Sequence, residues 1–199
     1  MTGVQTCALP IFPRQADRQT RNVAGERRGE VGHRLGQGSR VPRIVARDRG
    51  QEPGAVLDRA RQGADLIETN TFNANAISLA DYDLVDLAYE INYESAKIAR
   101  AVCDEFTDRN PDKPRFVAGI LGPTTRMTSM SPRTDDLAFR NIRFEDLVET
   151  YLDSIRGLVE GGTDLLLVET IFDTLNAKAA VYAIMQYRED TGHDIPHMI

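Results

Sequence analysis

Polar side chains follow three short apolar runs of the 199-residue sequence, at the point where each run ends. Thr-Asn-Thr-Phe ends the run in GADLIETNTF (63–72), Gly-Pro-Thr follows RFVAGIL (115–121), and Glu-Thr ends the run in TDLLLVET (163–170). A carboxylate can hold an ammonium group, whereas hydroxyls and turn N–H groups can hold a carboxylate. If the three ends meet, they suit a small zwitterion, with the ring of Phe72 as an apolar wall.

The candidate substrate-binding residues lie at these three ends. They are Glu169, Thr69, Asn70, Thr71, Phe72, Gly122, Pro123 and Thr124. Glu68 precedes this set by one residue and could either support the site or form a structural pair. Glu169 has a similar alternative, an ion pair with a neighbouring strand, although the strand ends of a parallel barrel usually carry the chemistry. No catalytic residue and no metal ligand is predicted in this chain.

The segments between the runs carry the apolar spacing of helices. Apolar residues recur at helical intervals over 84–106 and over 144–159, and a Gly-Gly pair closes the second segment. Asp173 is placed to cap a third helix that runs to about residue 187, and IPHMI (195–199) begins a fourth strand. The predicted order is therefore β-α-β-α-β-α-β, with the first strand over 64–71 and residues 72–83 as a connection.

This alternation predicts an α/β fold with a parallel sheet. It fits either an open doubly wound sheet or part of a (β/α)8 barrel. GADLIET and GTDLLLVET share a Gly-x-Asp, an apolar strand and a final Glu-Thr, which indicates a repeating unit. No strand is followed by a nucleotide-binding glycine motif, so we favour a partial (β/α)8 barrel. In either fold the carboxyl ends of the strands share one side, so the three polar ends should form one rim.

Composition limits the class of protein. The 199 residues are 41% hydrophobic, which suits one ordinary domain but is short for a complete barrel of about 250 residues. No run of about 18 apolar residues and no secretory signal is present, so we expect a cytoplasmic protein. Cys7 and Cys103 lie far apart, which argues against a disulfide scaffold or a self-contained zinc site.

The charge is divided between two parts of the chain. Residues 1–62 hold 12 Arg and 6 acidic residues, a balance of +6, whereas residues 63–199 hold 12 basic and 24 acidic residues, a balance of −12. A basic arm that binds RNA is one interpretation of the first part. We favour another, because MTGVQTCALPI resembles a translated cloning adapter and the following Arg/Gly-rich stretch resembles an out-of-frame gene. The expected domains are a disordered artefact over 1–60 and a partial barrel over 61–199.

Three longer motifs carry a resemblance to a known family. They are GADLIETNTFNANAISLADY, VAGILGPTTRMTSMSP and GLVEGGTDLLLVETIFDTLNAKAAV. From about residue 55 onward the chain resembles the homocysteine-binding domain of cobalamin-dependent methionine synthase, the 5-methyltetrahydrofolate:homocysteine methyltransferase. That domain is a (β/α)8 barrel, so the resemblance implies that this chain covers about strands two to five.

The resemblance also implies a reaction and a set of partners. In that family homocysteine binds at the carboxyl rim as a zinc thiolate and takes a methyl group from methylcobalamin to give methionine. The glutamate that contacts the substrate amino group matches Glu169, and the neighbouring rim segments match residues 69–72 and 122–124. The implied partners are homocysteine and the folate and cobalamin domains of a parent chain, with no nucleic acid and no membrane.

The sequence also departs from the family. The Asp-Gly-Gly-Met-Gly-Thr motif of the family's first strand is missing from residues 1–62. The three zinc-binding cysteines and the folate, cobalamin and reactivation domains are expected beyond Ile199. We therefore expect this chain to be inactive alone, without ligands for zinc or cobalamin.

The remaining metal-type side chains have structural interpretations. Cys103 lies on the apolar face of the 84–106 helix and is expected to be a small core residue. His193 and His197 have the i, i+4 spacing of a helical zinc site, but Pro196 and the strand context break that face. Residues 133–141 are expected to form a solvated loop.

Three functions therefore remain open. The first is an incomplete methionine synthase substrate domain. The second is a homocysteine S-methyltransferase that uses betaine or S-methylmethionine instead of cobalamin. The third is a non-enzymatic fragment with a basic arm.

Overall fold

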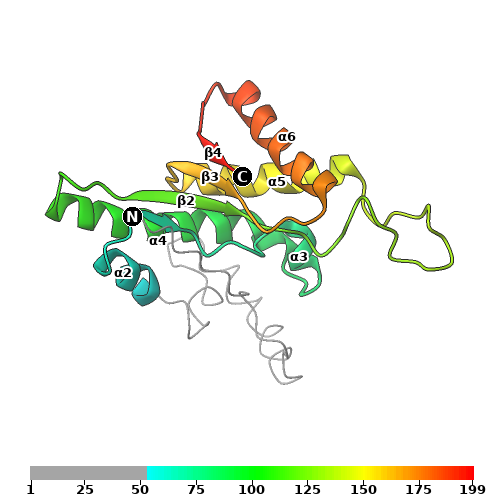
Figure 1. The fold of residues 1–199 in the computed structure, drawn as a ribbon, viewed down its shortest axis with the longest axis horizontal. Coiled ribbons are helices and arrows are strands. Elements are labelled where there is room, and N and C mark those ends of the chain that lie inside the picture. Colours follow the sequence, from blue (N-terminus) through cyan, green and yellow to red (C-terminus); the bar gives the residue numbers. More distant parts are fainter. Residues whose placement is uncertain (1–52) are drawn as a thin grey trace, which may run out of the picture.

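A four-stranded parallel sheet forms the centre of the protein. The computed structural model describes residues 53–199, in which the strands are β1 (Leu66–Glu68), β2 (Phe116–Leu121), β3 (Leu165–Val168) and β4 (His197–Met198). Their order in space, β1-β2-β3-β4, is also their order in the chain (Figure 1). The predicted α/β class and parallel sheet are confirmed. A sheet that grows in one direction is wound as in (β/α)8 barrels, but the four described strands form no closed barrel.

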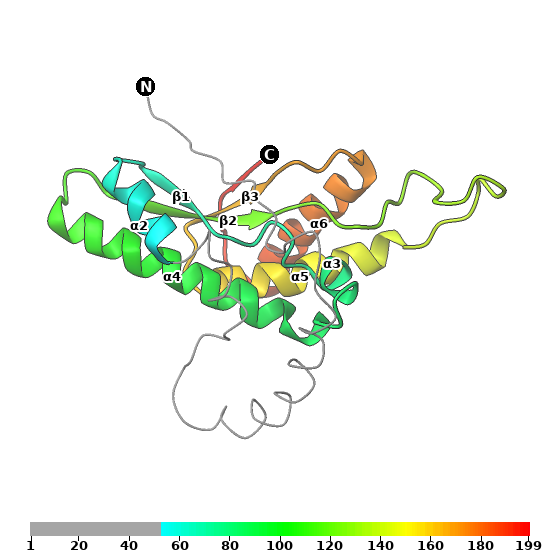
Figure 2. The ribbon, with the colours of Figure 1, turned by 90° about the horizontal axis from the view of Figure 1, so that it is seen from below.

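Helices connect the strands and cover one face of the sheet. They are α2 (Pro53–Arg61), α3 (Ala76–Ala80), the 3-10 turn η1 (Val85–Leu87), α4 (Ala88–Arg109), α5 (Phe144–Glu160) and α6 (Thr174–Thr191). Figure 2 shows α4 and α5 lying along the same side of the sheet. The predicted positions of α4, α5 and α6 are confirmed to within a few residues. Two short elements were not predicted: α3 lies in the expected connection over 72–83, and η1 replaces the first turn of the helix expected over 84–106.

The two faces of the sheet carry alternate residues of each strand. Ile67 and Val117 pack against α2 and α4, and Leu121, Leu166 and Val168 pack in the larger cluster with α5 and α6. The opposite face has its own small cluster, formed by the intervening residues. These are Leu66, Ala118, Ile120, Leu165 and Leu167, together with Phe72. Because side chains alternate along a strand, Glu68 and Glu169 belong to this second face.

Two glycines of α5 allow it to lie directly on α4. A Cβ atom at Gly157 would lie 2.6 Å from the carbonyl oxygen of Tyr89, and one at Gly161 would lie 2.5 Å from that of Tyr93. Larger residues at either position would push the helices apart. The two glycines therefore set how closely α5 packs against α4.

The start of the folded region differs from the sequence-based boundary at residue 61. Residues 53–61 form α2, and Ala60 is buried with Val56 and Leu57 against the β1 and α4 residues of one core cluster. These apolar residues are too few to show a helical period by themselves, and they become a helix because α4 offers them a surface. Residues 1–52, for which an artefact or a basic arm was expected, lie outside the described residues.

Candidate functional site

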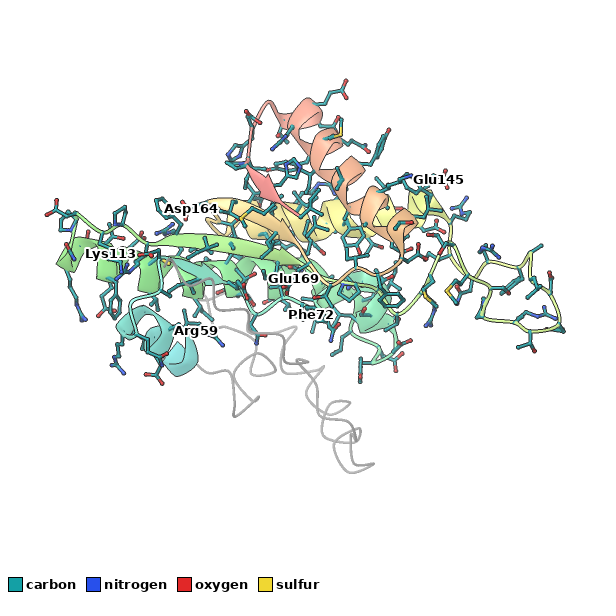
Figure 3. The ribbon with its side chains drawn as sticks, viewed as in Figure 1. Arg59, Phe72, Lys113, Glu145, Asp164 and Glu169 are labelled. Carbon is teal, nitrogen blue, oxygen red and sulfur yellow. The ribbon has the colours of Figure 1, made fainter. Side chains whose placement is uncertain are left out.

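The three predicted strand ends lie at the same end of the sheet. Figure 3 shows Glu169 and Phe72 close together there, with Lys113 and Asp164 toward the opposite end. This arrangement follows from the parallel sheet, because each strand runs in the same direction. We call residues 68–72, 122–124, 169 and 170 the carboxyl rim.

Glu169 is the residue that directly follows β3. Its backbone N–H donates to the carbonyl oxygen of Leu121 at 3.2 Å, which extends the β2–β3 ladder by one bond. The side chain is partly buried, and burial raises the pKa of its carboxyl, with a further rise from the nearby charge of Glu68. Within residues 56–199, the carboxylate of Glu169 forms no hydrogen bond or ion pair. It is therefore placed to receive a cation.

Glu68 contributes a second carboxylate to the same face. It ends β1, and its side chain is only 4% exposed. Two carboxylates that lie close enough to raise a pKa favour binding of a positive group between or beside them. The two acids come from strands on opposite sides of β2, so the sheet itself sets their separation.

Thr69 and Thr71 continue the pairing of β1 with β2 through their side chains. The Thr71 hydroxyl donates to the carbonyl oxygen of Ile120 at 2.9 Å, and the Thr69 hydroxyl accepts from the Ile120 N–H at 2.9 Å. The two hydroxyl oxygens are 2.7 Å apart. Since the single Thr71 proton is already used, Thr69 must donate to Thr71. This explains why β1 stops at Glu68, although the sequence predicted a strand through residue 71.

The Thr124 hydroxyl is engaged in the same way. It donates to the carbonyl oxygen of Arg126 at 2.6 Å and accepts from the amide of Asn176 at 3.1 Å. The hydroxyl protons of Thr69, Thr71 and Thr124 are thus used within the protein. In this geometry these three hydroxyls have no proton left to donate to a substrate carboxylate. Backbone N–H groups of the turns are the remaining candidates.

Gly122 lets the loop after β1 touch the end of β2. A Cβ atom there would lie 2.1 Å from the carbonyl oxygen of Phe72, so only glycine fits. The Gly122 carbonyl accepts from the buried Tyr151 hydroxyl at 3.0 Å, and the neighbouring Pro123 carbonyl accepts from Asn75 at 3.1 Å. These bonds hold Phe72 and the Gly-Pro-Thr turn against each other. Asn70, which is partly buried, lies in the same loop.

Thr170 has an unusual backbone conformation for a branched residue. Its φ is 55°, a left-handed value, at the position directly after Glu169. Such a conformation costs about 1–3 kcal/mol and is most common at functional sites. The strain turns the chain sharply from β3 toward α6.

Sequence reasoning missed the roles of three residues that hold the rim in place. Asn75 and Asn176 bridge neighbouring loops, and Asp173 has a second role beyond the predicted helix cap, because it also accepts from the Ser129 N–H at 3.0 Å. The cap itself is confirmed, with the Asp173 side chain accepting from Leu175 and Asn176. Asparagines shortly after the ends of β1 and β3 were the available signal.

The described residues do not fit the zinc site that the resemblance implies. Within residues 53–199, no three His, Cys, Asp or Glu side chains are grouped to hold a metal ion. Cys103 is fully buried on α4, as predicted, and burial raises the pKa of its thiol to about 11. His193 is exposed, and His197 accepts from Arg188 at 3.1 Å.

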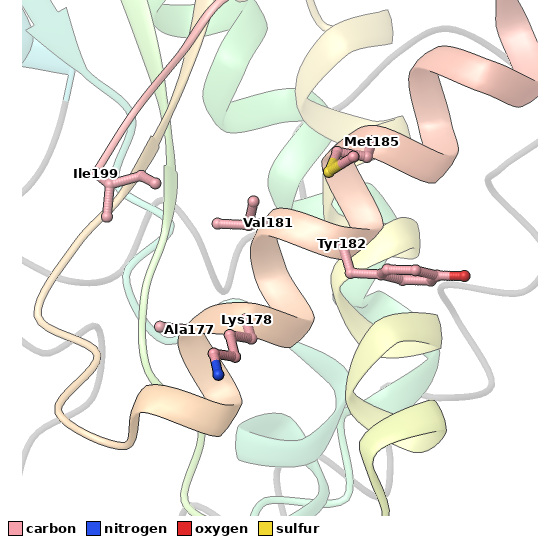
Figure 4. Close-up of a pocket in the computed structure, with 6 residues that line it drawn as sticks. All are labelled: Ala177, Lys178, Val181, Tyr182, Met185 and Ile199. Atoms are coloured by element: carbon pink, nitrogen blue, oxygen red, sulfur yellow. The ribbon is translucent and has the colours of Figure 1, made fainter.

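An apolar hollow lies away from the rim. It has a volume of about 380 Å³ and lies between α6 and the end of the chain (Figure 4). Its lining is Ala177, Lys178, Val181, Tyr182, Met185 and Ile199. None of these residues belongs to the carboxyl rim. Among the helices from Pro53 to the chain end, none is both long and apolar enough to cross a bilayer.

The fold and the rim together define a class, an α/β protein with a singly wound parallel sheet and a polar edge at the carboxyl ends of its strands. The chain belongs to the homocysteine S-methyltransferase family, whose model matches residues 56–199. The methionine synthase type within that family remains a prediction.

Solved structures agree with this fold. The chain is similar to the oxidized form of the homocysteine methyltransferase MmuM from Escherichia coli, with 18% identity and a TM-score of 0.58 over 80% of this chain and 56% of that chain. The metallated form gives the same identity and TM-score over 57% of its length, and the apo form gives 19% and 0.52 over 52%. The chain therefore spans a little over half the length of these structures.

Proposed function

We propose that the protein containing this chain transfers a methyl group to the sulfur of homocysteine, and that this chain supplies part of the amino-acid binding rim. The observation that carries the proposal is the Glu169 carboxylate, which lies at a strand end beside Glu68 and outside any ion pair of the described residues. A partly buried negative charge without a cation is unfavourable unless a ligand supplies one. The ammonium group of an amino acid fits this need.

The rim divides the recognition of homocysteine into three parts. Glu169 holds the ammonium group, and Glu68 increases the negative potential there. Turn N–H groups near Gly122 hold the substrate carboxylate, since the hydroxyl protons of Thr69, Thr71 and Thr124 are already used. The ring of Phe72 packs against the substrate's methylene groups. Thr69, Asn70, Thr71, Pro123 and Thr124 complete the proposed site by fixing the shape of these loops.

The reaction itself requires a reactive sulfur. The sulfur attacks the methyl carbon, a sulfur–carbon bond forms while the bond to the donor breaks, and the thiol proton is released. An ordinary thiol with a pKa of about 8.5 is mostly protonated at neutral pH, so the complete enzyme must favour the thiolate. Zinc does this in the family that the sequence resembles. The single cysteine of residues 56–199 is Cys103, which is buried on a helix.

The methyl donor has two candidates. The consecutive motifs of the sequence support methylcobalamin, recharged by 5-methyltetrahydrofolate on further domains of a longer protein. A betaine or a sulfonium such as S-methylmethionine is the alternative, and membership of the homocysteine S-methyltransferase family is equally consistent with it. Assays of the full-length protein with each donor in turn would distinguish them, because only one class should give methionine.

Substitution of Glu169 tests the proposal. In a full-length protein that contains residues 56–199, Glu169→Gln should weaken homocysteine binding by about 1.5–3 kcal/mol, the usual worth of a hydrogen bond to a charged group. Calorimetric titration measures this, and zinc content should stay unchanged. Glu149→Gln, an exposed position on α5, is the matched control and should bind normally. An unaltered homocysteine affinity in Glu169→Gln would show that the residue is merely structural.

A further inference from the structure

We propose that Asp173, the N-cap residue of α6, and Asn176, in its first turn, are positioning residues that set the substrate-binding turn after β2. This inference rests on the proposed function, because the turn that they hold is the one expected to bind the substrate carboxylate. We call the two side chains and their bonds the α6 clamp. Neither residue needs to touch the substrate for the clamp to act.

Asn176 forms the larger part of the clamp. Its amide oxygen accepts from the Thr128 N–H at 3.1 Å and from the Thr128 hydroxyl at 2.7 Å. Its amide nitrogen donates to the Thr124 hydroxyl at 3.1 Å and to the Arg126 carbonyl at 2.8 Å. The side chain is 2% exposed. A buried asparagine that uses both ends of its amide on one loop fixes that loop in two directions.

Asp173 holds the next residue of the same loop. One carboxylate oxygen caps α6 by accepting from Leu175 at 2.9 Å, and the other accepts from the Ser129 N–H at 3.0 Å. Burial pushes the pKa of Asp173 upward, but the bonds from Ser129 and from the helix backbone outweigh it, so the pKa lies below its usual value. The carboxylate is therefore charged at neutral pH, and its bond to the loop is charge-assisted.

The clamp separates a fixed base of the β2–α5 loop from a projecting tip. Arg140 returns from the far side of the loop and donates to the Thr128 carbonyl at 2.8 Å and to the Ser129 carbonyl at 3.2 Å. Both sides of the loop thus meet at the clamp. Beyond it, residues 132–139 are exposed and extend away from the sheet (Figure 1). Without the clamp, the base would share the freedom of the tip.

Helix formation does not explain Asn176. Asp173 already caps α6, so the helix needs no second cap from Asn176. Asparagine is also a poorer helix former than alanine, so helix stability alone would favour a different residue at position 176. All four bonds of its side chain go to the β2–α5 loop. The residue therefore acts on the rim and adds little to its own helix.

The clamp joins the two substrate-binding parts of the rim. Glu169 precedes α6, and the Gly-Pro-Thr turn precedes the loop that α6 holds. The direct ladder between β2 and β3 ends with the bond from Glu169 to Leu121. Past that bond, the clamp determines how far Thr124 and its neighbours lie from the Glu169 carboxylate. This separation must match the distance between the ammonium and carboxylate groups of the substrate.

The test measures steady-state kinetics of the full-length protein with homocysteine and methyl donor varied separately. Asn176→Ala should raise the KM for homocysteine by about tenfold or more, because small displacements of a binding group are costly. Asn176→Asp keeps the acceptor for Thr128 and should lie between wild type and Asn176→Ala. The KM for the methyl donor should not change in either variant.

Asp164→Asn is the matched control at the other end of the same strands. Asp164 links β2 to α4 by accepting from the Val117 N–H and from Arg100, and it lies far from the rim. This variant should lower the melting temperature without changing the KM for homocysteine. Thr128→Val removes a single bond of the clamp and keeps the Thr128 N–H, so it should fold and raise this KM by about threefold, the worth of about one hydrogen bond.

The outcomes separate the two proposals. A folded Asn176→Ala or Thr128→Val protein with a lower melting temperature but an unchanged KM for homocysteine overturns the clamp. A wild-type protein that takes up no homocysteine in calorimetry overturns the proposed function, and the substrate role of the clamp with it. A rise in the KM for homocysteine in the order wild type, Asn176→Asp, Asn176→Ala supports both.

Discussion

The two ends of the sheet use polar residues in opposite ways. At the amino end, Asp65 pairs with Arg115 at 2.9 Å and with Lys113 at 3.2 Å, and Asp164 pairs with Arg100 at 2.7 Å. At the carboxyl end, the loops are joined by threonine hydroxyls, asparagine amides and backbone groups. There, Glu169 stays outside every ion pair of the described residues.

This difference separates stability from binding. The amino end neutralises its acids with cations of the same chain, so its polar groups contribute to folding. The carboxyl end satisfies its hydroxyls internally and leaves a carboxylate partly buried, which raises its pKa and costs stability. Parallel α/β proteins place chemistry at the carboxyl ends of their strands, and the bonding pattern here follows the same division.

The largest effect should come from filling the contact between two rim loops. Gly122→Ala places a Cβ atom where the Phe72 carbonyl already lies, so the backbone of one of the two loops would have to shift. We expect a loss of about 3 kcal/mol in the free energy of unfolding. Urea denaturation of the full-length protein measures it. Gly192→Ala, where nothing lies within 4 Å but φ is +69°, should lose only about 1 kcal/mol. Equal losses of stability in the two variants would show that the close contact between Gly122 and Phe72 adds no extra cost.

Exchanging one acid at each end should dissociate stability from affinity. Asp164→Ala removes the bonds from Arg100 and from the Val117 N–H, so the free energy of unfolding should fall by about 2 kcal/mol. Its homocysteine affinity should stay unchanged. Glu169→Gln should do the reverse, with weaker homocysteine binding and an unchanged or slightly higher melting temperature. Equal losses of stability in the two variants would contradict the division of roles between the two ends of the sheet.

The pH dependence of binding should belong to the carboxyl end. The folded pKa of Glu169 lies above the ordinary glutamate value of about 4.3, so the proton is favoured in the free protein and the substrate ammonium must displace it. Homocysteine affinity should therefore decrease as the pH falls through this raised pKa, by up to about tenfold per pH unit. Calorimetry over a pH series measures it.

Two further variations check the sign of this effect. Glu169→Gln should bind weakly with no such slope, and a slope that persists in this variant would assign the titration to another group. Asp173 has the opposite shift, since its folded pKa is depressed. The contribution of Asp173 to stability is present above the ordinary aspartate pKa of about 3.9 and is lost only at lower pH. It therefore does not contribute to the pH dependence expected around the raised pKa of Glu169.

The smallest effect should come from relieving backbone strain on the rim. Asparagine tolerates a left-handed φ better than threonine, so Thr170→Asn should raise the free energy of unfolding by about 0.5–1 kcal/mol. Thr170→Val keeps a branched side chain and should give no gain. Thermal unfolding of the three proteins measures this difference. If Thr170→Val stabilises as much as Thr170→Asn, strain at φ is not the cause.

The elements were predictable because each carries a local pattern. The apolar stripe over 144–159 and the glycine pair after it predicted α5 closely, and Asp173 marked the start of α6. The run in 165–168 was too apolar for a half-exposed strand and proved to be the interior strand β3. Alternation of strands and helices then predicted the parallel sheet, and the parallel sheet predicted one rim.

The parts that were missed depend on contacts between distant segments. The end of β1 moved from residue 71 to Glu68 because hydroxyls replace backbone groups in the pairing with β2, and no local pattern reports this. Helix α2 forms on the surface of α4, which lies far away in the sequence. The bridging role of Asn176 becomes visible only when the loop after β2 is brought to α6.

The matching order of the strands in the chain and in the sheet has a consequence for synthesis. As the ribosome releases residues 53–199 from the amino end, each new strand of the described sheet finds its neighbour already made, since β2 adds to β1, β3 to β2 and β4 to β3. Only β1 has to wait for its first described partner, and every later strand adds to one that is already made. The edge left by each step stays open only until the next strand-helix unit emerges, which limits the time in which it can pair with another nascent chain.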